Sequence, residues 1–276
     1  MYSLHGKRAL VIGIRNKYSI ATQTALSFLS LGADVIGVSK EPLSFTAMEA
    51  CGLHKQALKF KLLSCDLTDE FALEELLRSC GQHFHGGIDT IVHSVAFASP
   101  EAFIPIQKDS QTPSGGLLQT SKAHWQQAQD ISAYSLVALT QKALPLLTKG
   151  SINADKSIIA FSFEGANKVV PSYNVMGPAK AALEAVSRQL AVELGGHNIR
   201  VNCVSPGPIN TASARGIPGF STMRQFAQEQ APLKRNATAL DIANLASFLA
   251  SEAASCITGQ TIKVDGGMSA LSSYNL

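Results

Sequence analysis

Short runs of apolar and β-branched residues recur along the chain, separated by longer stretches with helical periodicity. Because nearly every position in these runs is apolar, they are typical of strands covered on both faces, as in a parallel sheet. The expected strands are Arg8–Gly13, Ala33–Val38, Leu58–Cys65, Ile88–Val95, Ser157–Phe161, Arg200–Val204 and Thr261–Val264. The clearest helices are Ser19–Leu31, His124–Leu147, Tyr173–Leu194 and Asp241–Ala250. This alternation predicts an α/β fold with a doubly wound parallel sheet of about seven strands and helices on both faces.

Two segments rich in Pro and Gly, residues 99–121 and 207–226, interrupt the alternation. Each follows a predicted strand, so both should lie at the carboxyl edge of the sheet, where open α/β folds bind ligands. Loops of this length inside a compact domain are usually functional. We therefore expect residues 1–276 to form a single Rossmann-type nucleotide-binding and catalytic domain, with these two segments as walls of its substrate site.

The composition argues against several classes of protein: membrane-inserted, secreted, metal-binding and nucleic-acid-binding. The 46% of hydrophobic residues suit a soluble protein with a large interior, but no apolar run approaches the roughly 20 residues that span a bilayer. No secretory signal is visible, so we expect a cytoplasmic protein without membrane insertion. The five cysteines are odd in number and form no metal-like pair, which argues against disulfides and a metal site. A net charge of +3 is too weak to indicate nucleic acid.

The turn after the first strand is a candidate phosphate site. It begins at Gly13 and leads into a helix near Ser19, which would place backbone amides and a helix N-terminus beside a pyrophosphate. The turn has one glycine and fails the three-glycine dinucleotide fingerprint, so an ordinary strand-to-helix turn remains an alternative. After the second strand, Lys40 favours a 2′-phosphate and Glu41 a free hydroxyl, which leaves NADH and NADPH both open.

Tyr173 and Lys180 form the candidate catalytic pair. They are seven residues apart, about two turns at roughly 3.6 residues each, and share one helix face. A nearby ammonium would lower the pKa of the phenol, which could then donate to a developing oxyanion. The alternative is an amphipathic helix whose Tyr and Lys only extend their polar ends into solvent.

Around this pair, the sequence resembles the bacterial enoyl-acyl-carrier-protein reductases of the divergent short-chain dehydrogenase/reductase superfamily. The resemblance rests on Tyr173-x-x-Met176-x-x-x-Lys180 and on Gly207-Pro208-Ile209. Further motifs fall in the same order and spacing: Gly6-Lys7-Arg8, Ser19-Ile20-Ala21, Cys65-Asp66, His93-Ser94, Asp130-Ile131-Ser132 and Val264-Asp265-Gly266-Gly267. The ordinary branch of the superfamily has a lysine where this chain has Gly177 and a serine where it has Ala160, which counts against a carbonyl reductase.

The resemblance implies reduction of a trans-2-enoyl thioester by NADH, with NADPH possible, in fatty acid biosynthesis. By resemblance, Tyr173 and Lys180 would be catalytic, and Phe163, which stands where many members have a second tyrosine, would shape the pocket beside them. The implied cofactor residues are Gly13, Ser19, Ile20, Lys40, Asp66, Leu67, Val95, Lys180, Ile209 and Thr211. Those implied for substrate are Ala98, Phe163 and Tyr173.

The resemblance also implies an enoyl-acyl carrier protein or enoyl-CoA as substrate and a homotetramer as the assembly. The basic residues Arg215, Lys234 and Arg235, near or beyond the second loop, are candidates for steering an acidic carrier. Asn210 stands where an arginine is common, and the 99–121 segment is longer than the family leads us to expect. Two other functions stay open: a 3-oxoacyl or carbonyl oxidoreductase on the same scaffold, and a nicotinamide-binding regulator without turnover.

Overall fold

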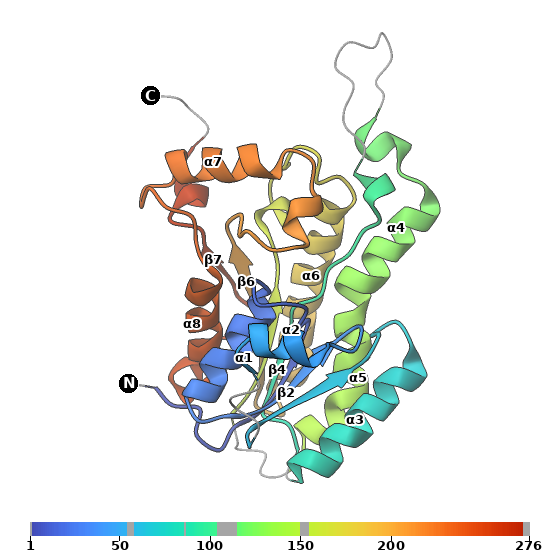
Figure 1. Ribbon diagram of the computed structural model, residues 1–276, viewed down its shortest axis with the longest axis vertical. Helices are drawn as coiled ribbons and strands as arrows, with labels where there is room; N and C mark the ends of the chain where they lie inside the picture. The colour runs from blue at the N-terminus through green and yellow to red at the C-terminus, as the bar shows by residue number, and fades with distance from the viewer. Residues whose placement is uncertain (1, 54–57, 86, 104–114, 150–154, 273–276) are drawn as a thin grey trace.

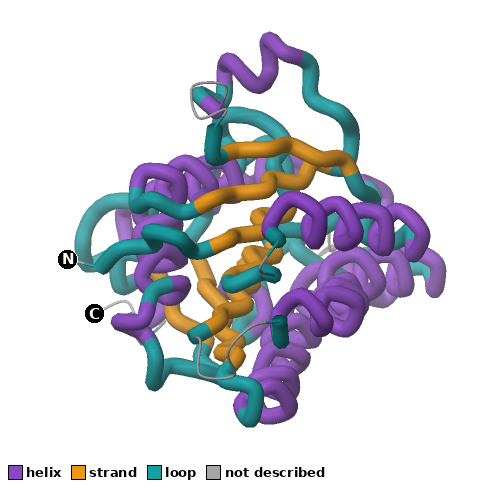
Figure 2. The backbone as a smooth tube through the Cα atoms, turned by 90° about the horizontal axis from the view of Figure 1, so that it is seen from below, coloured by secondary structure: helices purple, strands orange, loops and turns teal. Residues whose placement is uncertain are grey.

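A seven-stranded parallel sheet forms the centre of the molecule (Figures 1 and 2). The computed structural model describes residues 2–53, 58–85, 87–103, 115–149 and 155–272. In chain order the strands are β1 (Arg8–Ile12), β2 (Asp34–Ser39), β3 (Phe60–Ser64), β4 (Thr90–His93), β5 (Lys156–Phe161), β6 (Ile199–Pro206) and β7 (Thr261–Val264). Their order in the sheet is β3-β2-β1-β4-β5-β6-β7, and every neighbouring pair is parallel. The predicted fold class is confirmed.

The direction of winding reverses at β1. From β1 the chain moves outward through β2 and β3, then returns to place β4 on the other side of β1. In open α/β sheets, such a reversal opens a crevice beyond the carboxyl ends of the two strands, and ligands bind there. The topology therefore directs attention to the ends of β1 and β4.

Helices cover both faces of the sheet, as Figure 1 shows with α1 and α8 on one side and α3 and α5 on the other. The first layer is α1 (Ile20–Ser30) and α8 (Ala239–Ala250), with the short α2 (Phe45–Ala50) nearby. The second is α3 (Glu70–Phe84), α5 (Ser135–Leu147) and α6 (Met176–Gly195). Each layer closes its own apolar core against the sheet, which explains why the strands are apolar at almost every position. Among the described residues, no helix has the length and apolar character required to cross a bilayer.

The predicted helical stretch His124–Leu147 is helical throughout, but it is not one regular α-helix. The chain forms α4 (Lys122–Gln129), then a π-helical turn at Asp130–Tyr134, then α5. Inside that turn the Ser132 hydroxyl accepts a hydrogen bond from the backbone N–H of Phe97 (3.1 Å), and it lies 3.3 Å from the Phe97 carbonyl. A π-helical turn changes the direction in which the helix presents its side chains. Here Ser132 points to the loop after β4 and binds its backbone.

The predicted helix Tyr173–Leu194 begins three residues later than expected, at Met176. Ser172 and Asn174 have φ values of +63° and +42°, a conformation that a right-handed helix excludes. Residues 207–226 are also only partly a loop, because α7 (Phe220–Gln230) begins within them. The first predicted loop, 99–121, includes residues 104–114, which lie outside the described residues.

Candidate active site

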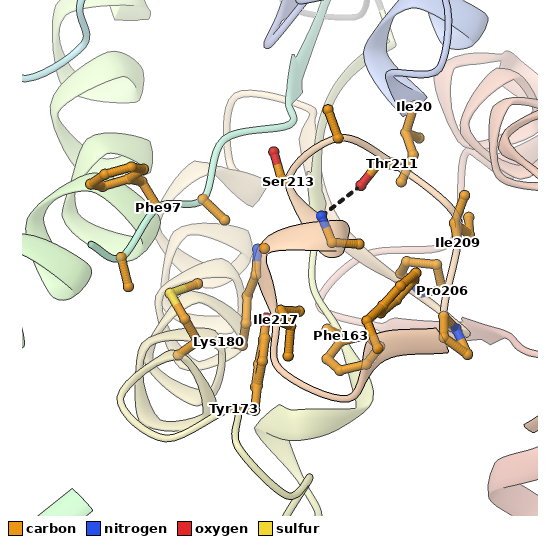
Figure 3. A pocket seen from close by; sticks show the side chains of 18 of the residues that line it. Ile20, Phe97, Phe163, Tyr173, Lys180, Pro206, Ile209, Thr211, Ser213 and Ile217 are labelled. Carbon is orange, nitrogen blue, oxygen red and sulfur yellow. Dashed lines mark hydrogen bonds between the residues drawn. The ribbon is translucent and has the colours of Figure 1, made fainter. Parts of the chain in front are cut away.

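A cavity of about 400 Å³ lies at the carboxyl edge of the sheet (Figure 3). Its walls come from the turn after β1, the loop after β4, the end of β5, the start of α6 and the segment after β6. Seven residues predicted from the sequence line it: Ile20, Ala98, Phe163, Tyr173, Lys180, Ile209 and Thr211. The predicted catalytic and substrate residues therefore meet in one place.

Tyr173 faces this cavity from a site that is closed to solvent. Its side chain is 7% exposed, and its ring meets that of Phe163 edge-on, with centroids 5.0 Å apart and planes at 63°. Burial raises the pKa of Tyr173 above its ordinary value. The expectation that Lys180 lowers this pKa is wrong for the protein alone, because burial outweighs any nearby positive charge. At neutral pH the phenol keeps its proton and is a hydrogen-bond donor.

Gly165, which the sequence did not single out, is what allows Tyr173 to lie so close to the chain. A Cβ atom at Gly165 would fall 2.5 Å from Cδ1 and 2.8 Å from Cε1 of Tyr173. Both distances are far inside van der Waals contact, so any side chain here would displace the ring. The only sequence signal was the position of Gly165 two residues after Phe163.

We expect Gly165→Ala to lower turnover by about 10²-fold, because a displacement of around 1 Å at a catalytic group can cost that much. Steady-state rates would be compared with those of Gly195→Ala at the end of α6, where an added Cβ meets nothing within 4 Å. Equal turnover in the two variants would show that the tyrosine ring has room to spare.

Lys180 is buried rather than extended into solvent. It is 5% exposed, and its Nζ donates to the carbonyl of Phe161 at 2.6 Å, which holds the amine at the end of β5. Burial lowers the pKa of Lys180 to about 8. Because Tyr173 and Lys180 are both buried and both line the cavity, the solvent-exposed amphipathic alternative is wrong.

The turn after β1 fits a bound dinucleotide. Gly13 has a φ of +103°, and a Cβ there would lie 2.2 Å from the carbonyl oxygen of Ser94, so the backbones of the two switch-point strands meet with no side chain between them. The Ser19 hydroxyl accepts from the N–H of Asn16 (3.1 Å) and caps none of the amides of α1, which stay available to an anion.

The ends of β2 and β3 carry the other predicted cofactor residues. Ser39 ends β2 with a buried hydroxyl that has no hydrogen-bond partner among the described residues, the kind of group that a ribose hydroxyl would satisfy. Lys40 Nζ pairs with Asp66 Oδ2 at 2.8 Å. Thus Gly13, Ser19, Lys40, Asp66 and Val95 do not line the cavity but follow strands along the same edge.

Leu67 lies elsewhere. It borders a second cavity, of about 590 Å³, together with residues of α3, α5 and the π-helical turn. Its side chain is 8% exposed and also belongs to the apolar core on that face. Leu67 is thus outside the first cavity, as Asp66 beside it is, and its contact with the cofactor stays a prediction.

Arg15 is a cavity residue that the sequence reasoning missed. It lines the cavity from the turn after β1, and no aspartate or glutamate is among the described lining residues. Its guanidinium makes no hydrogen bond or ion pair with any residue within the described ranges, while Lys180, the other lining cation, is bound to a carbonyl. The signal was present as a basic residue two positions after Gly13.

Arg215, on the segment after β6, is joined to the same turn. It belongs to the short helix η6 (Ala214–Gly216), and its Nε donates to Oδ1 of Asn210 at 2.9 Å. Its guanidinium lies over the ring of Tyr18, 5.4 Å from the centroid. Arg215 therefore links the segment after β6 to the turn after β1.

Comparison with known proteins agrees with this geometry. A family model described as enoyl-(acyl carrier protein) reductase matches residues 13–269. The enoyl-[acyl-carrier-protein] reductase [NADH] of Nostoc sp. (strain PCC 7120) is 39% identical over 97% of this chain and 98% of its own length. The corresponding [NADPH] protein of Staphylococcus aureus (strain MRSA252) is 35% identical over 98% and 100%. The crystal structure of enoyl-[acyl-carrier-protein] reductase (NADH) from Aquifex aeolicus VF5 is 35% identical, with a TM-score of 0.87 over 98% of this chain and 99% of that one.

Proposed function

The chain belongs to the enoyl-(acyl carrier protein) reductase family, and on that premise we propose that Tyr173 and Lys180 are the catalytic pair of an NAD(P)H-dependent enoyl-thioester reductase. The observation that carries the assignment is the buried Tyr173, which keeps its proton and lies beside Lys180 at a cavity whose described lining includes no Asp or Glu. A trans-2-enoyl thioester has its double bond saturated in this reaction, which belongs to fatty acid biosynthesis.

A reduced nicotinamide held beside Tyr173 and Lys180 would supply a hydride to the β-carbon of the thioester. Negative charge would then develop on the thioester oxygen, to which the Tyr173 hydroxyl would donate, and a proton taken up from water at the α-carbon would complete the saturation. One preorganised donor of this kind is worth about 3–4 kcal/mol in the transition state. Phe163 has no hydroxyl, so its part is to hold the Tyr173 ring by the edge-on contact. Lys180 is positioned by the Phe161 carbonyl to donate to the nicotinamide ribose.

NADH is the cofactor that the site at the end of β2 supports. Lys40 would be the natural partner of a 2′-phosphate, but Asp66 already neutralises it at 2.8 Å. A 2′-phosphate would have to displace that carboxylate, whereas a free 2′-hydroxyl would leave the pair intact. NADPH is used by some relatives, and a comparison of kcat/KM for the two cofactors measures the preference.

We also assign Arg15 to the cofactor diphosphate, because it lines the cavity from the turn that leads into α1 and has no ion-pair partner among the described residues. Arg15→Ala should raise the Kd for NADH by about tenfold, the loss of one charge-assisted hydrogen bond at roughly 1.5 kcal/mol. The measurement is a fluorescence titration without acyl substrate, so the phosphate of a carrier cannot contribute. Lys17→Ala is the control, since Lys17 lies in the same turn but over the Tyr18 ring. An unchanged Kd would remove Arg15 from the site.

A test of the function itself compares a 2-enoyl thioester with the 3-oxoacyl thioester of equal length under steady-state conditions. We expect faster turnover of the enoyl compound, since Gly177 and Ala160 occupy the places where a carbonyl reductase has its lysine and serine. Faster reduction of the 3-oxo compound would favour the carbonyl oxidoreductase. Tight nucleotide binding without reduction of either would favour a regulator.

Of the three basic residues expected to steer an acidic carrier protein, one is engaged in an ion pair. Arg235 forms a two-point ion pair with Asp241, at 2.9 and 3.2 Å, and is committed to the cap of α8. Lys234, just beyond α7, donates from its Nζ to the carbonyl of Glu229 and has no ion-pair partner in the part of the chain that the structure describes. We propose that Arg215 and Lys234 steer an acidic carrier. Salt should then slow carrier-linked substrate more than a short neutral thioester, and parallel salt dependence would count against docking.

We further propose one domain, a homotetramer and a cytoplasmic location. Val192 on α6 is 80% exposed and Tyr134 before α5 is 58% exposed, so both helices present apolar side chains that an assembly could cover. Light scattering at micromolar concentration tests the assembly, and a monomer mass would contradict it.

A further inference from the structure

Glu184 is a buried carboxyl group that the reaction described above does not use. It is 4% exposed and lies on α6 four residues after Lys180, on the same face of the helix. Acidic side chains are almost never this deeply buried unless their oxygens are satisfied, because leaving a charge without partners in the interior is costly. A specific role would account for its retention there.

Both oxygens of Glu184 accept hydrogen bonds from the turn that follows β5. Oε1 accepts from the Ser162 hydroxyl at 2.6 Å, and Oε2 accepts from Nδ2 of Asn167 at 3.1 Å. Each carboxyl oxygen thus has a side-chain partner that can donate to it. The two donors bracket the short helix η5 (Glu164–Ala166), and Glu184 therefore holds the turn from both ends.

This turn forms the cavity wall behind Tyr173. Phe161 is already held from α6 through its carbonyl by Lys180, and Ser162 is held by Glu184, so two consecutive residues are fastened to the same helix. The next residue, Phe163, places its ring against Tyr173. Movement of this turn would therefore move both the Lys180 amine and the support of the catalytic ring.

We propose that Glu184 is a positioning residue, whose carboxylate fixes the Ser162–Asn167 turn against Tyr173 and supplies the negative charge that balances Lys180 inside the protein. This inference rests on the catalytic roles assigned above to Tyr173 and Lys180. It predicts two separable effects: one on geometry, through the hydrogen bonds, and one on charge, through the ionisation of Lys180.

The charge effect has a definite sign. The titratable groups around Lys180 are Glu184 on its own helix, Tyr173 at the cavity, His93 on β4 and Cys203 on β6. Burial lowers the pKa of His93 to about 3 and raises that of Cys203 to about 11, so both are neutral near pH 7, as is Tyr173. Cys203 and then Glu184 oppose the effect of burial on the pKa of Lys180, and because the Cys203 thiol is neutral near pH 7, the carboxyl group of Glu184 is the one left to do so there. Without its charge, the pKa of Lys180 falls below about 8.

Glu184→Gln isolates the charge. The amide has the shape of the acid, its oxygen still accepts from Ser162, and the Asn167 amide can turn to offer its own oxygen. We expect the alkaline limb of the pH profile, in both kcat/KM and the Kd for NADH, to move to a pH lower by about 1. Glu184→Asp, which keeps the charge, should leave that limb near its wild-type position. Glu193→Gln, an exposed substitution on the same helix, is the matched control.

Ser162→Ala isolates the geometry, because it removes one hydrogen bond and leaves the charge. We expect a fall in kcat of about tenfold with the alkaline limb in place. The proposal would be overturned if Glu184→Gln kept both the wild-type kcat and the wild-type position of the alkaline limb. If the glutamine variant does not fold, an unchanged kcat in Ser162→Ala would overturn it. The Kd profile needs no turnover, so failure of the reductase assignment and failure of this inference would be told apart.

Discussion

Tyr173→Phe should lower kcat for enoyl reduction by about 10²–10³-fold, while the Kd for NADH stays near that of the wild type. The substitution removes one hydroxyl from a ring that is already buried against Phe163, so the packing at 5.0 Å is kept and only the donor is lost. Loss of a single oxyanion donor typically has this cost. Because the hydroxyl donates most strongly once charge has developed, kcat and kcat/KM should fall together.

Single-turnover rates and a cofactor titration measure the two quantities separately. Phe163→Tyr is the companion variant, since it adds a hydroxyl beside the same ring, and we expect it to change the rate only mildly. Turnover of Tyr173→Phe equal to that of the wild type would mean that another group stabilises the oxyanion.

Lys180→Met should affect cofactor and rate together. Methionine keeps most of the apolar stem but removes the ammonium, so the Phe161 carbonyl and the ribose both lose a charged donor. A hydrogen bond to a charged group contributes about 1.5–3 kcal/mol, which corresponds to a rise in the Kd for NADH of roughly 10–100-fold. Lys180→Ala should do the same, with an added loss of packing. Unchanged NADH affinity in a titration would place Lys180 away from the cofactor.

The pH dependence of the wild type follows from the same residue. The pKa of Lys180 in the protein is about 8, lower than in an unfolded chain, so the charged amine is present below that pH and is lost as pH rises through it. The affinity for the anionic cofactor should therefore decline above about pH 8. This decline of cofactor affinity above about pH 8 should be absent in Lys180→Met.

Much of the fold was predictable because burial on both faces leaves a plain signal in the strands. The apolar runs located all seven strands, with boundaries that differ by a few residues at most. The π-helical turn at Asp130–Tyr134 was not predictable from periodicity, and neither was the tertiary contact that its Ser132 makes with the backbone of Phe97. Periodicity reports which side of a helix is buried, and it carries no information about such a contact.

The candidate site also has features that the sequence predicted and features that it did not. Tyr173 and Lys180 were found from their seven-residue spacing, although Tyr173 lies before α6 and the two side chains do not share a helix face. The turn at Gly13 was found from the transition between a predicted strand and a predicted helix. The ionisation of Tyr173 was predicted with the wrong direction, since sequence shows the nearby lysine but not the depth of burial. Gly165 and Glu184 gained their meaning only in three dimensions, the first from a ring 2.5 Å from its missing Cβ and the second from donors 17 and 22 residues away.

The most direct test of the reductase assignment follows the hydride itself. The protein would be supplied with a trans-2-enoyl thioester and NADH carrying deuterium at the transferable position of C4, and the product would be examined by mass spectrometry and NMR. The account predicts a saturated acyl thioester with the deuterium on the β-carbon. A product without deuterium, deuterium on the α-carbon, or an enoyl thioester recovered unchanged while a 3-oxoacyl thioester is reduced would contradict it.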